Sequence, residues 1–215
     1  MLDVGAGTGS GAAALTSRTG ADVVALDSSH TMARRSAARG LPAVVADGHR
    51  LPFRTATFDA VTADRVLQHL SRPEEAVREM LRVLRPGGRI GLADPDYDTQ
   101  VLDIEDQALA REVLRFRADV LLRNGTLAHR HPGLLARHGC DNVTAEARTL
   151  VLRDPAAADN CMGLRSWAHT AAEAGHLTAA QADRFVDRFD TAVRTRRFTY
   201  VVTFFLTTAT GPAAP

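Results

Sequence analysis

The sequence predicts an α/β fold in which short, mostly parallel strands alternate with helices. Three observations indicate it. The apolar segment at residues 1–4 runs straight into a loop with glycines at positions 5, 7 and 9. Short apolar runs then alternate with segments that carry apolar residues at helical spacing. Strands separated by helices imply βαβ units, in which helices cover both faces of a parallel sheet.

The first helix and the next strand follow directly from the glycine loop. A helix is expected over Ser10–Thr19, because Gly20 accepts the positive backbone angle that ends many helices. The strand at Asp22–Leu26 contains an apolar run, which is typical of a parallel strand buried on both faces. The remaining elements expected in this half are a helix at Ser29–Arg39 and strands at Ala43–Ala46, Phe58–Ala63 and Arg89–Ala93.

The helix before the last of these strands has a start signal and a stop signal. Ser71 and Glu74 have the spacing of a capping box, in which side chains bond free amides of the first turn. The residues 86–88, Pro-Gly-Gly, end the helix because proline cannot continue it and glycine accepts positive φ. The expected buried face of this helix consists of Ala76, Val77, Met80, Leu81 and Leu84.

The second half is richer in helices. A long helix is expected over Leu102–Arg123, and a second capping box, Thr178 with Gln181, opens the last helix. The other expected elements are a helix at Gly133–His138, a strand at Asn142–Leu152, helices at Ala156–Ala174 and Thr178–Thr195, a strand at Phe198–Thr208 and a frayed tail at 209–215. We expect one domain over residues 1–215, with a cofactor-binding half at 1–99 and a helical insertion and C-terminal strands at 100–215.

The composition suits one globular domain and removes several functions. The chain has 215 residues, 45% of them hydrophobic, and a formal net charge of +1, which indicates no basic surface for nucleic acid. All 26 cationic side chains are arginines. A Walker-type phosphate loop and a pyridoxal enzyme both need a lysine, so neither is expected. Cys140 and Cys161 are too few for a disulfide framework, and we expect free buried thiols.

No segment of the sequence is typical of a membrane protein. No apolar run approaches the ~20 residues that cross a bilayer, and no signal peptide precedes the first strand. We therefore expect a soluble cytoplasmic protein.

The segment LDVGAGTG at residues 2–9 is the most informative one for function. Glycines at a strand-to-helix turn let the backbone approach a ligand closely. Alone the segment is a weak signal, because Gly7, Gly9 and Ala12 also fit the dinucleotide-binding pattern G-x-G-x-x-[GA]. A glycine turn that binds nothing would have the same sequence.

Three aspartates strengthen the case for a nucleoside ligand. Asp27 ends the second strand, where a carboxylate can accept both hydroxyl hydrogens of a ribose. Asp47 and Gly48 end the third strand, where they can meet the edge of an adenine. Asp3 lies in an otherwise apolar strand and needs backbone amides or a ligand ammonium as a partner. Each alone could simply cap the next helix.

Together these residues resemble the class I S-adenosylmethionine-dependent methyltransferases, and more narrowly their ubiquinone- and menaquinone-biosynthesis-like branch. LDVGAGTG is similar to the first motif of that family, VVALDSS to the second and VVADGHRLPF to the third. FDAVTADRVLQHL resembles the fourth strand and the helix after it, and LRVLRPGGRIGLADPDYDT resembles the next helix, turn and fifth strand. TYVVTFFLTTATGP resembles the last strand, so the resemblance covers nearly the whole chain.

The resemblance implies a Rossmann-like seven-stranded sheet of order 3-2-1-4-5-7-6, with strand seven antiparallel and helices on both faces. It implies S-adenosylmethionine as the methyl donor and S-adenosylhomocysteine as the product. By position, Asp3 and the loop residues Gly5, Ala6, Gly7 and Gly9 would lie at the methionine end of the cofactor. Asp27 would hold the ribose, and Ser28 and Met32 would flank adenine or ribose. Asp47 and Gly48 would meet the adenine amino edge, and Asp64 and Arg65 would lie near the cofactor's methionine and the reacting centre.

The sequence departs from the family at its beginning. Members of the family have several tens of residues before the first motif, which form helices over the cofactor, whereas Met1 falls within the first strand here. Either the start was assigned late or the chain is naturally shortened at its N-terminus. We expect an open cofactor site, with a second copy of the chain or a partner subunit as its cover.

Several residues are candidates for contact with the methyl acceptor. Methyl transfer from a sulfonium mainly requires alignment of the acceptor, and a base only where the acceptor must lose a proton. His69, about one turn beyond Arg65, is our candidate base, although a locally packed histidine would fit equally. Asp94, Asp96 and Tyr97 follow the fifth strand, where they either contact the acceptor or only form a turn.

The sequence does not predict a metal site. Four potential ligands are close in sequence, but their spacing matches no zinc pattern. They are His129, His131, His138 and Cys140.

We therefore expect S-adenosylmethionine-dependent methylation of a small molecule, quinone-like or a secondary metabolite. The alternatives are a non-methylating cyclase, isomerase or cofactor-binding subunit on the same fold, and, less favoured, an NAD(P)-dependent oxidoreductase. Asp3 ahead of the loop and Asp47 and Gly48 at the third strand argue against the oxidoreductase.

Overall fold

The computed structural model describes residues 1–213, apart from the side chains of residues 160–162. Seven strands form one sheet in the predicted order β3-β2-β1-β4-β5-β7-β6, with β7 antiparallel. The strands are β1 (Leu2–Val4), β2 (Val24–Asp27), β3 (Ala43–Val45), β4 (Phe58–Asp64), β5 (Leu84–Leu102), β6 (Asp141–Leu152) and β7 (Tyr200–Thr210). The α-helices are α1 (Ser10–Thr19), α2 (His30–Ala37), α3 (Pro73–Val83), α4 (Gln107–Phe116), α5 (His131–Arg137), α6 (Pro155–Met162), α7 (Leu164–Glu173) and α8 (Ala179–Arg194). Three short helical turns complete the described chain: η1 (Leu67–His69), η2 (Arg117–Leu121) and η3 (Ala128–Arg130).

The parallel register brings the ends of the central strands together. In β1, Asp3 pairs with Thr62 of the neighbouring β4. At the end of β4, Asp64 pairs with Ala93 of β5. Because the carboxyl ends of parallel strands lie at one edge of a sheet, these four residues share that edge.

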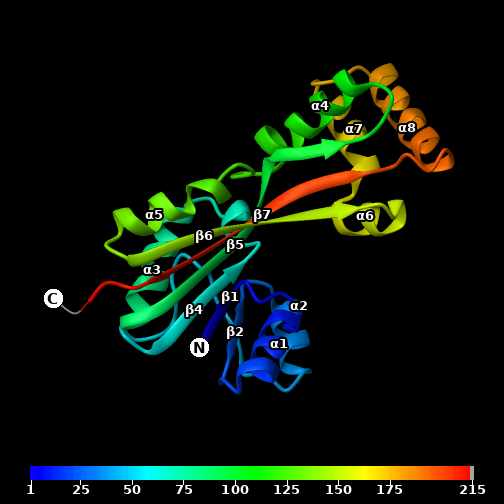
Figure 1. Cartoon of the computed structure of the whole chain (residues 1–215). Coiled ribbons are helices and arrows are strands. Elements are labelled where there is room, and N and C mark those ends of the chain that lie inside the picture. Colours follow the sequence, from blue (N-terminus) through cyan, green and yellow to red (C-terminus); the bar gives the residue numbers. More distant parts are fainter. Residues whose placement is uncertain (214–215) are drawn as a thin grey trace. The chain divides into compact units, whose positions relative to one another are not determined.

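The chain divides into two compact units, each with its own hydrophobic core. The first comprises Met1–Asp94, Leu127–Glu146 and Phe205–Pro215, and the second comprises Pro95–Thr126 and Ala147–Phe204. In the first unit, α1 and α2 lie on one side of the strands β1, β2 and β4, and α3 lies on the other (Figure 1). Both faces of these strands are therefore covered, as the apolar strands require. The single domain over residues 1–215 stays a prediction.

Aromatic side chains form part of the core of the second unit. Phe185 and Phe189 of α8 are fully buried, as is Tyr200 at the start of β7. The Phe189 ring lies 5.2 Å from the Phe198 ring, and the Trp167 ring lies 6.3 Å from the Tyr200 ring, both edge to face. Burial of each such side chain stabilises the fold by roughly 1.5–3 kcal/mol.

The start of α3 differs from the prediction. The capping box at Ser71 was wrong, because Arg72 is the N-cap residue and its side chain makes no capping hydrogen bond. Pro73 occupies the first helical position, where its fixed φ favours the start of a helix. The helix therefore begins one residue later, and the Arg72 guanidinium pairs with Glu75 at 2.9 Å instead.

The long helix expected over Leu102–Arg123 was also wrong in extent. Strand β5 continues to Leu102, well beyond the predicted end at Ala93. Asp106 then caps α4 by accepting a hydrogen bond from the Leu109 amide at 3.1 Å. The helix changes to a π-helical turn at Arg117, so the predicted single helix is a strand end, an α-helix and a π-helical turn.

Two further differences arise from a single glycine and from the C-terminal segment. The helix predicted over Ala156–Ala174 is broken at Gly163, which has a φ of +68°. Helix α6 ends at this residue, and α7 begins directly after it. The prediction of a frayed tail at residues 209–215 was wrong for its first residues. Strand β7 continues to Thr210, and the Gly211 amide donates to the Gly88 carbonyl at 2.8 Å. Residues 214 and 215 lie outside the described residues. By contrast, the capping box of Thr178 and Gln181 is confirmed, with both of its hydrogen bonds present.

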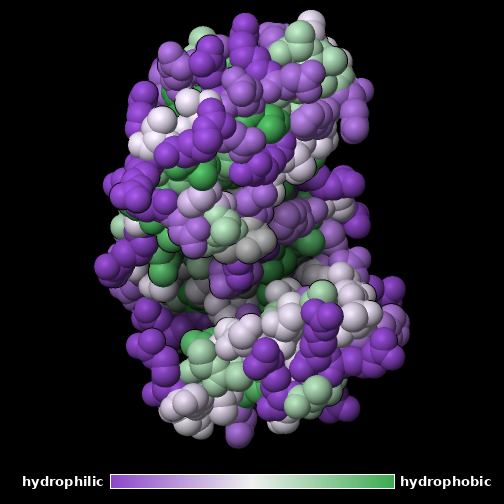
Figure 2. Space-filling model, turned by 90° about the vertical axis from the view of Figure 1, so that its right-hand side faces the viewer, coloured by the Kyte–Doolittle hydropathy of each residue, from purple (hydrophilic) through white to green (hydrophobic). Residues whose placement is uncertain are grey.

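The surface is mixed in character. On the face drawn in Figure 2, hydrophilic side chains are interspersed with small groups of apolar ones. Among residues 1–213, no helix combines the length and the apolar character needed to cross a membrane. The cytoplasmic location stays a prediction.

Candidate functional site

The glycine loop between β1 and α1 is built on three positive φ angles. Gly5, Gly7 and Gly9 have φ of +69°, +57° and +76°, which glycine adopts without strain. A Cβ at Gly5 would lie 2.4 Å from Val66 Cγ2, and one at Gly9 would lie 2.7 Å from Ser36 Oγ, so both positions are closed by packing. A Cβ at Gly7 would meet no atom within 4 Å. Gly7 is therefore the point where the loop backbone faces open space.

That open space is a cavity of about 510 Å³ at the carboxyl edge of the central strands. This volume lies within the range of small-molecule sites. The structure brings seven of the predicted site residues to its wall: Asp3, Gly5, Ala6, Gly7, Met32, Asp64 and Arg65. The sequence reasoning missed six others: Thr8, Ser10, Gly11, Leu15, Thr62 and Ala93.

The strand register explains the most distant of the missed residues. Thr62 and Ala93 lie beside Asp3 and Asp64 in the sheet because they are the register partners of those residues. The signal that could have found them is the rule that parallel strands end at one edge, applied residue by residue to the neighbouring strands.

Asp3 is a buried carboxyl group in the wall of this cavity. Only 5% of the residue is exposed. Burial, and secondarily the negative charge of Asp64, raise the pKa of Asp3 from 3.8 to about 7. The carboxyl group therefore changes charge near neutral pH, and a positive group in the cavity would favour its anionic form.

Asp27 fixes the glycine loop from the end of β2. Its Oδ2 accepts a hydrogen bond from the Gly7 amide at 2.9 Å, and its Oδ1 accepts one from the Ser29 amide at 2.8 Å. A carboxylate has about four acceptor positions, so two stay free for a ligand. Asp27 and the neighbouring exposed Ser28 do not line the cavity. Gly9 does not line it either, because it packs against α2.

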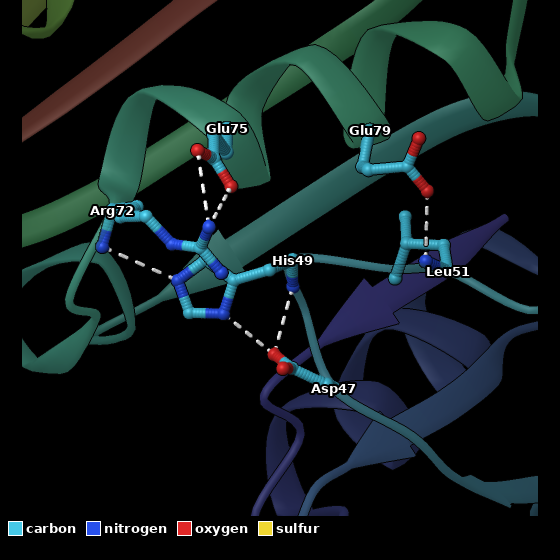
Figure 3. Close-up of polar contacts among 6 residues, drawn as sticks. All are labelled: Asp47, His49, Leu51, Arg72, Glu75 and Glu79. Carbon is cyan, nitrogen blue, oxygen red and sulfur yellow. Dashed lines mark hydrogen bonds and ion pairs between the residues drawn. The ribbon is translucent and has the colours of Figure 1, made fainter.

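Asp47 lies in a chain of polar contacts that ends at α3 (Figure 3). Its Oδ1 accepts a hydrogen bond from the His49 amide at 2.9 Å and lies 2.6 Å from His49 Nδ1. His49 Nε2 in turn accepts a hydrogen bond from the Arg72 amide at 3.3 Å. The hydrogen bonds from His49 hold the pKa of Asp47 below its usual range. Asp47 is thus an exposed carboxylate in a fixed orientation, next to the buried Gly48.

The end of β4 places a charged pair at the rim of the cavity. Arg65 Nε lies 3.4 Å from Asp64 Oδ1, and both side chains are more than half exposed. Arg65 has a φ of +57°, and its amide donates to the Ala93 carbonyl at 2.7 Å. The hydrogen bond to β5 holds this turn in its left-handed conformation.

The predicted base and acceptor contacts lie away from the cavity wall. His69 is exposed on η1. Asp94 is 1% exposed, and burial, with the charge of Asp64, raises its pKa from 3.8 to about 8. Its Oδ2 lies 3.7 Å from Nε2 of the fully buried His131. Asp96 and Tyr97 are buried in the second unit, where Tyr97 lines a separate cavity. Their roles stay predictions.

The histidines near Cys140 have separate partners. His131 faces Asp94, and His138 Nε2 lies 3.4 Å from Glu74 Oε1. Cys140 is a buried free thiol, as predicted, and burial raises its pKa. The Cys161 side chain lies outside the described residues. Within the described part of the chain, no three metal-ligating side chains gather.

The sequence that forms this cavity is similar to known methyltransferases. Residues 2–92 match a family model described as a methyltransferase domain. A 37.1 kDa protein of transposon Tn4556 from Streptomyces fradiae is 36% identical over 193 residues, which cover 86% of this chain and 56% of that protein. The demethylmenaquinone methyltransferase of Mycobacterium bovis is 42% identical over 102 residues, or 47% of this chain and 43% of the enzyme. The chain thus spans about half the length of these relatives.

The fold is also found in solved structures. The YcgJ protein of Bacillus subtilis superposes with a TM-score of 0.63 at 19% identity, covering 99% of this chain and 92% of that protein. At this identity the likeness concerns the fold, and it agrees with the sheet order described above.

Proposed function

We propose that this chain, whose residues 2–92 match a methyltransferase family model, is a class I S-adenosylmethionine-dependent methyltransferase that transfers a methyl group from S-adenosylmethionine to a small-molecule acceptor. The observation that carries the proposal is the cavity at the glycine loop, with the buried Asp3 in its wall. When bound, S-adenosylmethionine supplies a methyl group that is already activated on a sulfonium. The protein then needs to bind the cofactor and the acceptor, align the two and exclude water.

Asp3 and Gly7 in the cavity wall, and Asp27 and Asp47 outside it, fit the parts of this cofactor. The cofactor carries an ammonium group, and Asp3 is a carboxyl group that gains its charge near neutral pH. It carries a ribose, and Asp27 keeps two acceptor positions free beside the loop. It carries an adenine amino group, and Asp47 is an exposed acceptor held in place by His49. The open backbone at Gly7 leaves room for close approach.

Fewer observations support the roles that we propose for residues near the methyl acceptor. Asp64 and Arg65 at the rim would orient the acceptor, and His69 would take up a proton where the acceptor must lose one. Asp94, Asp96 and Tyr97 remain our proposed acceptor contacts. The partial relatives that methylate demethylmenaquinone support a quinone-like acceptor.

A cover for the cavity is part of the same proposal. Ser10, Gly11, Asp64 and Arg65 line the cavity and are exposed. A second copy of the chain or a partner subunit would exclude water from this wall. A monomer that binds the cofactor product tightly would contradict this part.

The experiment that tests the function is calorimetric titration of the chain with S-adenosylhomocysteine, with NAD as the control ligand. We expect saturable binding of the first and none of the second. The affinity should rise with pH up to about pH 7 and then level off, because an ammonium binds only the charged form of Asp3 and that carboxyl has a pKa of about 7. The expected gain is about tenfold between pH 6 and pH 8, following the charged fraction.

Two variants sharpen this test. Asp3→Asn should bind more weakly at pH 8 and lose the pH dependence, whereas the exposed Asp22→Asn should retain both. Binding of NAD in place of S-adenosylhomocysteine would overturn the proposal in favour of an oxidoreductase. Binding without methyl transfer to any quinone or phenol tested would favour a non-methylating protein on the same fold.

A further inference from the structure

His49, in the loop between β3 and β4, joins the exposed carboxylate of Asp47 to the start of α3 (Figure 3). The His49 side chain is 11% exposed, whereas that of Asp47 is 64% exposed. On one side of the ring, Nδ1 lies 2.6 Å from Asp47 Oδ1. On the other side, Nε2 lies 3.3 Å from the amide nitrogen of Arg72, the N-cap residue of α3. The ring is therefore held from both sides.

The two partners determine which ring nitrogen of His49 carries the proton. A backbone amide only donates hydrogen bonds, so Nε2 is the acceptor of the Arg72 amide and carries no proton. In a neutral imidazole the proton then lies on Nδ1. Nδ1 therefore donates to Asp47 Oδ1, which also accepts from the His49 amide at 2.9 Å. These two hydrogen bonds hold the pKa of Asp47 below its usual range, so the carboxyl group is charged at neutral pH.

Both hydrogen bonds from His49 reach the same oxygen of Asp47. Within residues 1–213, no hydrogen bond from another residue reaches Oδ2. Two donors on Oδ1 restrict rotation of the carboxylate, because any rotation breaks at least one of them. Oδ2 is therefore a charged acceptor in a fixed position on an exposed side chain.

The strand register places Asp47 next to the proposed ribose acceptor. Asp27 at the end of β2 pairs with Val45 of β3, and the Ala46 amide donates to the Asp27 carbonyl at 3.1 Å. Asp47 follows directly. Because the base of a nucleoside is attached to its ribose, two carboxylates at neighbouring strand ends suit these two parts of one ligand.

The loop that carries His49 is also attached to α3 by contacts that do not involve Asp47. The Leu51 amide donates to Glu79 Oε2 at 2.8 Å, and the Arg82 guanidinium donates to the Leu51 carbonyl at 3.0 Å. The order of the loop and the contact of His49 with Asp47 are therefore separable by substitution.

We propose that His49 is a positioning residue that holds Asp47 Oδ2 in place to accept a hydrogen bond from the exocyclic amino group of adenine, so that the site prefers a 6-aminopurine to a 6-oxopurine. A 6-oxopurine carries a carbonyl oxygen at that position, which cannot donate and would face the negative carboxylate. This inference rests on the proposed function, because it assigns the adenine of the cofactor to Asp47.

The ligands that test the inference are S-adenosylhomocysteine and S-inosylhomocysteine, which has a 6-oxo group in place of the amino group. In calorimetric titration of the unmodified chain, we expect the inosyl ligand to bind at least about tenfold more weakly. Equal affinities would overturn the inference and leave the proposed cofactor site intact. Binding of neither ligand would overturn the proposed function and the inference with it.

Three variants separate positioning from a structural role. His49→Phe keeps a ring and removes both nitrogens, so Asp47 must be ordered when the ligand binds. The preference for the adenosyl ligand should fall at least about threefold. His49→Asn supplies an amide donor near the position of Nδ1 and should restore most of the preference. Glu79→Gln weakens the attachment of the loop to Arg82 and should leave the preference unchanged. An unchanged preference in His49→Phe, or an equal loss in Glu79→Gln, would overturn the inference.

A spectroscopic measurement keeps the test decisive if His49→Phe does not fold. Nitrogen NMR distinguishes a protonated ring nitrogen from an unprotonated one, and the His49 signals are those absent from His49→Asn. At pH 8 we expect the proton on Nδ1 and none on Nε2, as the Arg72 amide requires. The opposite tautomer would leave Asp47 without its side-chain donor and would overturn the inference. The comparison of the two ligands likewise needs only the unmodified chain.

Discussion

The first unit buries two carboxyl groups with raised pKa values, and the second buries a guanidinium between two aromatic rings. Asp3 and Asp94 are 5% and 1% exposed, and both have pKa values raised to near or above neutrality. Arg117 is 8% exposed and lies between two rings. The carboxyl groups can become neutral by binding a proton, whereas the guanidinium cannot lose one.

This difference has a functional meaning. A buried acid can stay neutral until a cation arrives, so its burial is compatible with an empty site at neutral pH. A buried arginine keeps its charge and needs aromatic faces or an anion at all times. The two acids of the first unit therefore change charge as the pH changes, whereas Arg117 keeps its charge.

The largest expected effect is the pH dependence of the free energy of unfolding that the buried carboxyl group of Asp94 causes. Its pKa is about 8 in the folded protein, against a usual value of 3.8. The folded state thus binds this proton more tightly than the unfolded chain, and the free energy of unfolding falls as pH rises from about 4 to about 8. The full fall is on the order of 5 kcal/mol for this residue. Asp94→Asn should lack it, and urea unfolding at both ends of that range measures the difference.

Two titratable groups lie next to Asp94 and are unchanged in this variant. Asp64 and His131 are the titratable groups that face Asp94, and both stay in the variant. The variant should be more stable than the unmodified chain above pH 8 and close to it near pH 4. Asp22→Asn, at an exposed position, should follow the unmodified chain throughout. A difference that does not grow with pH would mean that Asp94 stays charged in the folded protein.

The next effect tests whether charge or volume dominates at Arg117. Arg117→Ala should lower the free energy of unfolding by about 3 kcal/mol, because it leaves a void between the Tyr97 and Trp167 rings. Arg117→Met fills the same space without a buried charge and should be neutral or stabilising by about 1 kcal/mol. Chemical denaturation compares the two variants. If methionine destabilises as much as alanine, the attraction between cation and rings holds the cluster together.

The two units also differ in how far their sequences predict them. In the first unit, the glycine loop and the strand-end aspartates are local signals. They carry the family resemblance, and that resemblance implied the sheet order and seven residues of the cavity wall. Thr62 and Ala93 were missed because only the register between strands brings them to Asp3 and Asp64. A periodic pattern within one segment carries no information on that register.

In the second unit, the important contacts are long-range. Tyr97, Arg117 and Trp167 lie on separate elements and form one stack. The sequence reasoning did not single out Arg117, and nothing in the neighbouring sequence indicates two enclosing rings. The predicted helix was also wrong at the same place, where α4 changes to the π-helical turn.

The smallest expected effect is the loss of stability when a helix N-cap is removed. It distinguishes a capping box that forms in the structure from one that only the sequence suggests, with one example in each unit. Thr178 and Gln181 form both hydrogen bonds of a capping box, so Thr178→Ala should lower the free energy of unfolding by about 1 kcal/mol. Ser71 has the same sequence spacing to Glu74, but Arg72 is the N-cap residue of α3 and Pro73 sets its start. Ser71→Ala should therefore change stability by less than about 0.5 kcal/mol. Chemical denaturation measures both, and an equal loss in the two variants would mean that Ser71 caps α3 in solution and that the sequence pattern was right.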